Sequence, residues 1–279
     1  MKNLTEIINK SDCALNVQHT ALEIATSTNT LLKEMAEKGA NEGTVLTAET
    51  QTAGRGRLDR SFYSPESGLY MSILLRPNER NATLGAEGAL RITTAAAVAV
   101  CRAIETVCGR KCGIKWVNDI YADGKKLCGI LVEGALLPGK AELDYAVLGI
   151  GVNIEAPKNG FPEEIRSVAG AIYEYGKVPE KTDVRSALAA EIITEFSKIY
   201  ANSLCGKVDK NEAFINEYRT RSVLNGRRIE IFRTAEAENG VAIEVNADCS
   251  LKVETDNGEH LNLTYGEVRI KMKDQIDNE

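Results

Sequence analysis

Three apolar segments between residues 114 and 154 limit the possible folds more than any other part of the sequence. Ile114–Tyr121, Leu127–Leu137 and Tyr145–Ile154 are each rich in β-branched or other apolar residues. The first two are joined by Ala122-Asp123-Gly124-Lys125 and the last two by the turn Pro138-Gly139-Lys140. Asp-Gly is typical of a hairpin turn. Three successive antiparallel strands predict an α+β fold and not a doubly wound parallel sheet.

The segments before this region alternate between strand and helix patterns. An Ala-rich stretch with almost no helix breaker, Ala86–Val107, predicts a buried helix of about six turns. The other expected elements are a strand in Asn16–Ile24, a helix in Thr30–Lys38, and strands in Thr44–Glu49 and Leu69–Leu75.

Two more helices are expected before the sequence pattern changes to short alternating segments after Asn225-Gly226. Thr182-Asp183 can cap a helix that runs to about Ser203, and a shorter helix is expected in Lys210–Arg221. Short alternating segments then follow between turn residues, which predicts a small β-barrel or sandwich: Arg228–Arg233, Gly240–Asn246, Leu251–Thr255 and Val268–Met272. With the boundary near Leu224, we predict domains at 1–223 and 224–279.

Composition excludes several classes of protein. The net charge of -6 and pI near 5.3 argue against coating nucleic acid or an anionic membrane. No run approaches the roughly 18 apolar residues of a membrane helix, and Met1–Lys10 lacks the order of a signal peptide, so we expect a cytoplasmic protein. Seven irregularly spaced cysteines indicate reduced thiols, and Cys108 and Cys112 have no nearby His to complete a zinc site.

Two segments resemble nucleotide-binding signatures but lack their context. Gly134–Lys140 nearly matches a P-loop, yet Ala141 follows where a hydroxyl is needed and the next segment reads as a strand. We therefore interpret it as a hairpin turn. Gly149-Ile150-Gly151 begins a dinucleotide fingerprint without its third glycine or its helix. These glycines are better suited to let a ligand lie flat on a strand.

The most informative loop runs from Gly54 to Arg60, between two predicted strands, and we call it the Gly/Arg loop. It places Arg55, Arg57 and Arg60 on a backbone freed by glycine. Exposed N–H groups and planar guanidinium forks suit a carboxylate or phosphate, which predicts an anion-binding loop. A solvated flexible loop is the simpler alternative. A nucleic-acid-binding Arg-Gly tract would need repetition and a basic chain.

In combination, five ordered motifs resemble the biotin protein ligases. They cover most of residues 20–155: Ser27-Thr28-Asn29; Gly54-Arg55-Gly56-Arg57 with Arg60, Ser64-Pro65 and Gly68-Leu69-Tyr70; Lys115-Trp116-Val117-Asn118-Asp119-Ile120; Lys125 to Glu133; and Gly149-Ile150-Gly151-Val152-Asn153. The resemblance implies a mixed, largely antiparallel sheet flanked by helices, like that of class II aminoacyl-tRNA synthetases, and a C-terminal SH3-like barrel.

Such enzymes join biotin to ATP as biotinyl-5′-adenylate, release pyrophosphate, and pass the biotinyl group to a lysine of a carboxylase carrier domain. The first step brings a carboxylate against a triphosphate, so the site needs cations. By similarity, Arg57 and Lys115 are the expected catalytic residues, beside the biotin carboxylate and the α-phosphate, and Arg55 and Arg60 supply further charge.

The resemblance also implies a substrate-binding set. For biotin it comprises Ser27, Thr28, Asn29, Gln51, Gly54, Arg55, Arg57, Tyr70, Lys115, Gly129, Gly149 and Gly151. Ser27, Thr28, Gln51 and the backbone of Arg55 would bind the ureido ring. Ser27-Thr28-Asn29 could equally cap a helix. The three last-named glycines would admit the apolar body of biotin beside Tyr70.

For ATP the implied set is Arg55, Arg57, Arg60, Phe62, Lys115 and Asn153, with adenine stacking on Phe62 and read by Asn153. Mg²⁺ should accompany ATP, but no carboxylate identifies itself as its ligand; Asp119 is a candidate and could be only a turn residue. The sequence departs from the family at Asp59, Phe62 and Val117, where glycine, tryptophan and proline are frequent. We expect altered affinity, since an acid weakens anion binding and a phenyl ring stacks less than indole.

Three other functions fit the sequence less well. A lipoate-protein ligase shares the fold and adenylation chemistry but carries an Arg-rich, Gly-Gly-Gly stretch in this loop. A biotin-responsive repressor needs a three-helix DNA-binding module, and fewer than twenty residues precede the first predicted strand. A non-catalytic biotin binder would not require Lys115 together with the arginines. We therefore expect a monomeric or homodimeric ligase that uses biotin, ATP and a carrier domain of acetyl-CoA carboxylase or a related carboxylase, and no nucleic acid or membrane.

Overall fold

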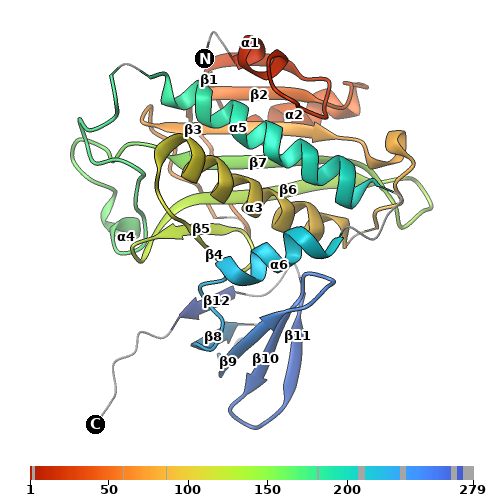
Figure 1. The fold of residues 1–279 in the computed structure, drawn as a ribbon, viewed down its shortest axis with the longest axis vertical. Helices are drawn as coiled ribbons and strands as arrows, with labels where there is room; N and C mark the ends of the chain where they lie inside the picture. The colour runs from red at the N-terminus through yellow and green to blue at the C-terminus, as the bar shows by residue number, and fades with distance from the viewer. Residues whose placement is uncertain are drawn as a thin grey trace.

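The computed structural model describes residues 1, 4–58, 60–85, 87–180, 182–206, 211–232, 237–264 and 269–272. Two sheets dominate it, the larger carrying helices on its faces and the smaller lying below it in Figure 1. No helix in these ranges is long and apolar enough to cross a membrane. Asp59, and the predicted element ends at Ala86, Lys210, Arg233 and Val268, lie outside the described residues.

The larger sheet has seven strands in the order β1-β2-β3-β7-β6-β5-β4. β1 and β2 pair in parallel, and all other neighbours are antiparallel. This confirms the predicted mixed, largely antiparallel sheet. The strands are β1 (Gln18–Ala25), β2 (Thr44–Gln51), β3 (Gly68–Leu75), β4 (Gly113–Lys115), β5 (Asp119–Ala122), β6 (Lys125–Leu136) and β7 (Leu143–Asn153).

The hairpins were predicted well, with one correction. Asp123 and Gly124 both have positive φ, 49° and 74°, as a two-residue turn between β5 and β6 requires. Leu137 N–H donates to the Glu142 carbonyl across the next turn, so the P-loop-like segment is a hairpin connection. The single strand expected in Ile114–Tyr121 was wrong. The chain reverses at Trp116-Val117-Asn118, where the Trp116–Val117 peptide is cis, and forms the β4–β5 hairpin.

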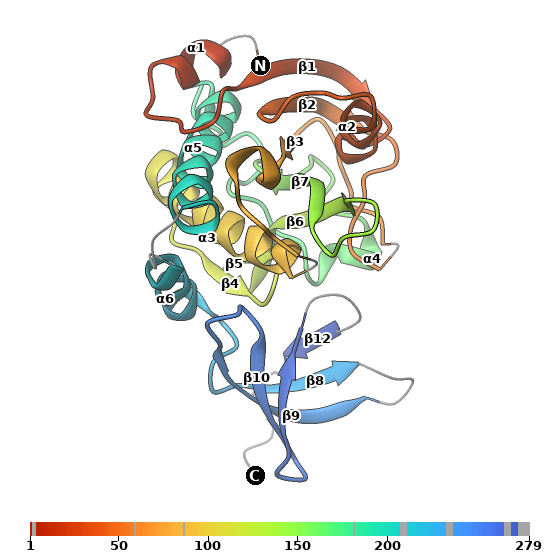
Figure 2. The ribbon, with the colours of Figure 1, turned by 90° about the vertical axis from the view of Figure 1, so that its right-hand side faces the viewer.

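Helices cover the two faces of this sheet unequally (Figures 1 and 2). α3 (Gly88–Cys108) and α5 (Val184–Ile199) pack together on one face, with α1 (Leu4–Asn9) against α5. Asp183 caps α5 as predicted, because its carboxylate accepts from the Ser186 N–H. α2 (Thr28–Glu37) lies on the opposite face, over β2, β3 and β7. The remaining helical segments are η1 (Pro77–Arg80), α4 (Glu163–Arg166), the π-helix η2 (Tyr200–Leu204) and α6 (Asn211–Arg221).

The alternation of side chains along each strand separates these two faces. On β7, Leu148, Ile150 and Val152 join the main hydrophobic core beneath α3 and α5. The residues between them, Gly149 and Gly151, point to the other side. We call the two sides the core face and the pocket face. The chain therefore builds its core and its substrate-sized pocket on opposite sides of the same strands.

The smaller sheet has five antiparallel strands in the order β11-β10-β9-β8-β12. They are β8 (Arg228–Phe232), β9 (Glu238–Val245), β10 (Leu251–Thr255), β11 (His260–Leu263), which was not predicted, and β12 (Arg269–Met272). Its residues contact the larger part directly, since Trp116 Nε1 donates to the Cys249 carbonyl at 2.9 Å. Buried residues from both sheets form one continuous cluster. A domain boundary at residue 224 therefore stays a prediction.

Candidate functional site

A pocket of about 550 Å³ lies on the pocket face, beneath the Gly/Arg loop. All but one of the predicted site residues line it: Ser27, Thr28, Asn29, Gln51, Arg55, Arg57, Arg60, Phe62, Tyr70, Lys115, Gly129, Gly149, Gly151 and Asn153. Gly54 is the exception. It is buried at the base of the loop, where a Cβ would come within 2.4 Å of the Phe62 carbonyl oxygen and 2.6 Å of Ser64 Oγ. Gly54 therefore allows the loop to close on itself.

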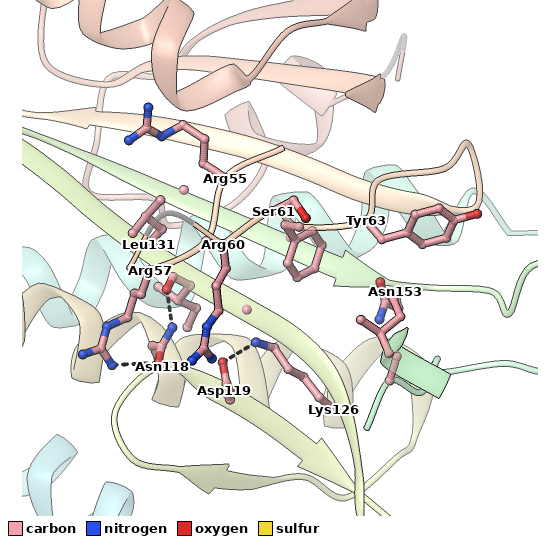
Figure 3. Close-up of a pocket in the computed structure, with 18 of the residues that line it drawn as sticks. Arg55, Arg57, Arg60, Ser61, Tyr63, Asn118, Asp119, Lys126, Leu131 and Asn153 are labelled. Atoms are coloured by element: carbon pink, nitrogen blue, oxygen red, sulfur yellow. Dashed lines mark hydrogen bonds and ion pairs between the residues drawn. The ribbon is translucent and has the colours of Figure 1, made fainter. Parts of the chain in front are cut away.

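Cations gather at one end of the pocket. Figure 3 shows Arg57 and Arg60 extending from the loop toward Asn118 and Asp119. Arg57 Nη1 donates to Asn118 Oδ1 at 3.3 Å, and the Asn118 amide is held by the Ile130 carbonyl at 2.8 Å. Asn118 thus positions Arg57. Because the Gly/Arg loop lies far in sequence from the motif that contains Asn118, only the fold brings Arg57 and Asn118 together.

Two lysines complete this end of the pocket. Lys115 comes from the last position of β4, and its Nζ lies 5.8 Å from the centre of the Tyr121 ring. Burial raises the pKa of the Tyr121 hydroxyl, and the nearby Asp119 carboxylate raises it further, so Tyr121 stays neutral. Lys126, at the start of β6, pairs with Asp119 Oδ1 at 2.5 Å. A lysine at this position was missed as a site residue, although it lies in a motif that marked the resemblance.

Uncharged polar groups form the opposite end of the pocket. Ser27 occupies the N-cap position of α2 but makes no capping hydrogen bond with its side chain. Thr28 N–H donates to Gln51 Oε1 at 2.9 Å, and Gln51 Nε2 donates to Ser64 Oγ at 3.0 Å. These buried or half-buried groups can bind a ligand that has both N–H and C=O groups at fixed positions.

Glycines lie between the two ends, on β6 and β7. The space above Gly149 is filled by Asn29, since a Cβ at Gly149 would lie 2.1 Å from Asn29 Oδ1. Above Gly151 and Gly129 lies the Phe62 ring, at 2.6 Å and 3.0 Å from the corresponding Cβ positions. That ring meets Tyr70 edge to face, with centroids 6.3 Å apart. A ligand body lying on these two glycines would displace Phe62.

Tyr70 and Asn153 support the walls of the pocket. Tyr70 is buried and its hydroxyl donates to the Pro65 carbonyl at 2.7 Å, while burial raises its pKa, so it acts as a neutral wall. Asn153 Nδ2 donates to the Gly170 carbonyl at 2.8 Å and holds the segment after α4 in place. The stretch that contains α4 lines the pocket through Phe161, Glu164, Ile165 and Ser167 to Ala169. No sequence motif indicated its role.

Arg55 is placed differently from the other two arginines of the loop. In Figure 3 its guanidinium points away from Arg57 and Arg60. Arg55 Nη2 instead lies 3.1 Å from the carboxylate of Glu133 on β6. The expected cluster of four cations from Arg55, Arg57, Arg60 and Lys115 therefore contains three of them, with Lys126 in addition.

Comparison with known proteins gives a consistent family assignment. Residues 21–153 match the model of the Biotin/lipoate A/B protein ligase family. A biotin–[acetyl-CoA-carboxylase] ligase of Mycobacterium tuberculosis is 30% identical over 210 residues, covering 74% of this chain and 71% of that protein. The bifunctional ligase/repressor BirA of Bacillus subtilis is 36% identical over 179 residues, which is 64% of this chain. The chain spans about half the length of that relative, 52%.

A solved structure agrees over nearly the whole chain. The biotin protein ligase of Aquifex aeolicus, in complex with biotin and ATP, matches with a TM-score of 0.72 and 25% identity. The match covers 92% of this chain and 99% of the other. The motifs, the pocket they build and these relatives lead to one conclusion. The chain belongs to the biotin protein ligase family.

Proposed function

We propose that this chain is an ATP-dependent biotin protein ligase. Biotin would be activated as biotinyl-5′-AMP with release of pyrophosphate, and the biotinyl group would then pass to a lysine of a biotin carboxyl carrier domain. The observation that carries the proposal is the division of one pocket into a cationic end, with Arg57, Arg60, Lys115 and Lys126, and an uncharged polar end at Thr28 and Gln51. This division matches a substrate with a carboxylate at one end and a cyclic urea at the other.

In the first step, the biotin carboxylate attacks the α-phosphorus of ATP and pyrophosphate leaves. Both reactants are anions, so the barrier includes their repulsion and the charge of the transition state. Lys115 and Arg57 would hold the two reacting groups, and Arg60 would bind the polyphosphate. Asn118 keeps Arg57 oriented before substrate arrives, which lowers the cost of reorganisation.

In the second step, the amine of the carrier lysine attacks the acyl carbon of the adenylate. An amide bond forms, the acyl–phosphate bond breaks, and AMP leaves while the amine loses a proton. The adenylate must be kept from water until then. The Gly/Arg loop lies over the pocket and would exclude water between the two steps.

Mg²⁺ would enter with ATP. Among the described residues there is no group of three or more His, Cys, Asp or Glu side chains that could hold a metal ion. Asp119, the candidate ligand, is paired with Lys126. The described residues therefore build no cluster of that size for a resident metal ion, and Mg²⁺ would be held mainly by the phosphate oxygens of its own substrate complex.

The acceptor in this proposal is the carrier domain of acetyl-CoA carboxylase or a related carboxylase. The names of the relatives support it, since the Mycobacterium tuberculosis protein is a biotin–[acetyl-CoA-carboxylase] ligase. All seven cysteines are free, which is consistent with a reducing, cytoplasmic setting. A monomer or a homodimer would serve equally.

Biotin-dependent exchange of pyrophosphate into ATP tests the first step. Purified protein should catalyse exchange with biotin and not with lipoate. Exchange with lipoate alone would contradict the proposal and indicate a lipoate-protein ligase of the same fold.

Lys115→Ala tests the role of the cationic end. Adenylate formation should fall about a thousandfold, because a charge acting mainly on the transition state is lost. Biotin affinity, measured by titration calorimetry, should weaken far less. Equal losses would mean that Lys115 only holds substrate.

A further inference from the structure

Glu133 carries a largely buried carboxylate and has no role in the reaction proposed above. It lies on the pocket face of β6, and its side chain is only 15% exposed. Three donors surround its carboxylate: Asn29 Nδ2 at 3.0 Å, Arg55 Nη2 at 3.1 Å and Lys33 Nζ at 3.4 Å. Burial of a charged carboxylate costs free energy unless charged or hydrogen-bonding groups compensate for it, so Glu133 depends on these three donors.

The carboxylate determines how the amide of Asn29 is turned. A carboxylate can only accept hydrogen bonds, so Asn29 must direct Nδ2 toward Glu133 and Oδ1 away from it. Asn29 Oδ1 lies 2.6 Å from Ser72 Oγ, and both side chains are buried. Ser72 must therefore donate its only hydroxyl hydrogen to Asn29.

The polar contacts continue from Ser72 to Thr28, which lines the pocket. Ser72 Oγ lies 2.8 Å from Thr28 Oγ1, and Ser72 has no second hydrogen to give. Thr28 then donates its own hydrogen to Ser72 Oγ or to Gln51 Oε1, which lies 3.2 Å from Thr28 Oγ1, and in both cases lone pairs of its oxygen remain for the pocket that it lines. Glu133, Asn29, Ser72 and Thr28 thus form a polar chain with one allowed direction.

We infer that Glu133 is a positioning residue, which fixes the direction of this polar chain so that Thr28 accepts an N–H from a cyclic urea. Through Arg55 the same carboxylate holds the start of the Gly/Arg loop beside that end of the pocket. The inference rests on the proposed function, and it makes ureido recognition depend on a charge outside the pocket lining.

Glu133→Gln tests the inference with almost no change in shape. The amide has one acceptor oxygen, so it cannot accept from Asn29 and Arg55 as a carboxylate does. The KM for biotin in pyrophosphate exchange should rise about tenfold, as expected for loss of a charge-assisted hydrogen bond, with kcat within about twofold. Glu23→Gln, an exposed change on β1, is the matched control and should leave both constants unchanged.

A second pair of variants separates the polar chain from simple ion pairing. Ser72→Ala removes the hydroxyl between Asn29 and Thr28 and should raise the KM for biotin by a similar factor. Adding Asn29→Asp to Glu133→Gln exchanges donor and acceptor between the two positions and keeps Ser72 as a donor. Biotin affinity should then recover to within about threefold of wild type.

These measurements separate a failure of the proposed function from a failure of the role assigned to Glu133. Wild-type protein without biotin-dependent exchange would overturn the proposed function. Wild-type exchange with an unchanged KM in Glu133→Gln and Ser72→Ala would overturn only the role of Glu133. A double variant as weak as Glu133→Gln alone would also overturn the polar chain, because it would limit Glu133 to pairing with Arg55.

Discussion

The two faces of the seven-stranded sheet are built from the same strands but have different roles. On β7, Leu148 and Val152 are fully buried beneath α3 and α5. Their neighbours Gly149 and Gly151 line the pocket. The core face fills space with aliphatic side chains, and the pocket face leaves space by omitting them. Stability and substrate recognition can therefore be changed separately by substitutions one residue apart.

Gly151→Val should produce the largest effect on function. Its Cβ would lie 2.6 Å from the Phe62 ring, and the valine side chain would occupy space on the pocket face beside that ring. Exchange activity with biotin should fall at least about a hundredfold, while a β-branched residue suits a strand and the urea unfolding midpoint should change little. An active variant would show that the glycine strip does not lie under the ligand.

Leu148→Ala should show the reverse pattern. The side chain is fully buried on the core face, so its truncation should lower the free energy of unfolding by about 3 kcal/mol. Biotin affinity at a temperature where the variant is folded should stay within about threefold of wild type. The measurements are urea denaturation and titration calorimetry. A large loss of affinity would mean that the two faces are not independent.

Acid should lower the folding stability that comes from the ion pairs at α3 and α6. Arg221 of α6 pairs with Glu105 of α3 at 2.7 Å and with Glu217 of its own helix at 2.9 Å. The hydrogen bond from Arg221 lowers the pKa of Glu105, and hydrogen bonds from arginines lower that of Glu217 against the effect of desolvation. A lowered folded-state pKa gives stability that is present above the ordinary value of about 4.3 and is lost as pH falls below it.

The expected loss between about pH 5 and pH 3 is on the order of 1 kcal/mol for these partly exposed pairs. Urea unfolding at a series of pH values measures it. Arg221→Met should flatten this dependence, because the carboxyl groups would then titrate nearer their ordinary pKa values. An unchanged slope in that variant would assign acid sensitivity to other groups.

Local signals predicted the fold where the chain turns back on itself. Asp123-Gly124 indicated the β5–β6 hairpin because both positions need positive φ. The strand expected through Trp116 and Val117 was wrong because nothing in the apolar pattern marks a reversal there. The parallel pairing of β1 with β2 depends on the path of α2 between them, which residue patterns do not describe.

The sequence motifs predicted which residues line the site, but not which of those residues contact one another. The motifs identified the residues that line the pocket, because each carries a side chain or a glycine that its chemistry needs. They did not indicate that Arg55 would turn to Glu133, or that Phe62 would lie over Gly151. Such contacts depend on tertiary packing between segments that are distant in sequence. The wall from Phe161 to Ala169 was missed for the same reason.

Transfer of biotin to a carrier tests the central claim most directly. The purified chain would be incubated with biotin, Mg·ATP and a biotin carboxyl carrier domain, and the intact carrier mass would be measured. A carrier with its acceptor lysine changed to arginine serves as the control. We predict one biotinyl adduct on the unaltered carrier, none on the control and almost none with Gly151→Val. No adduct with biotin, or an adduct formed only from lipoate, would contradict it.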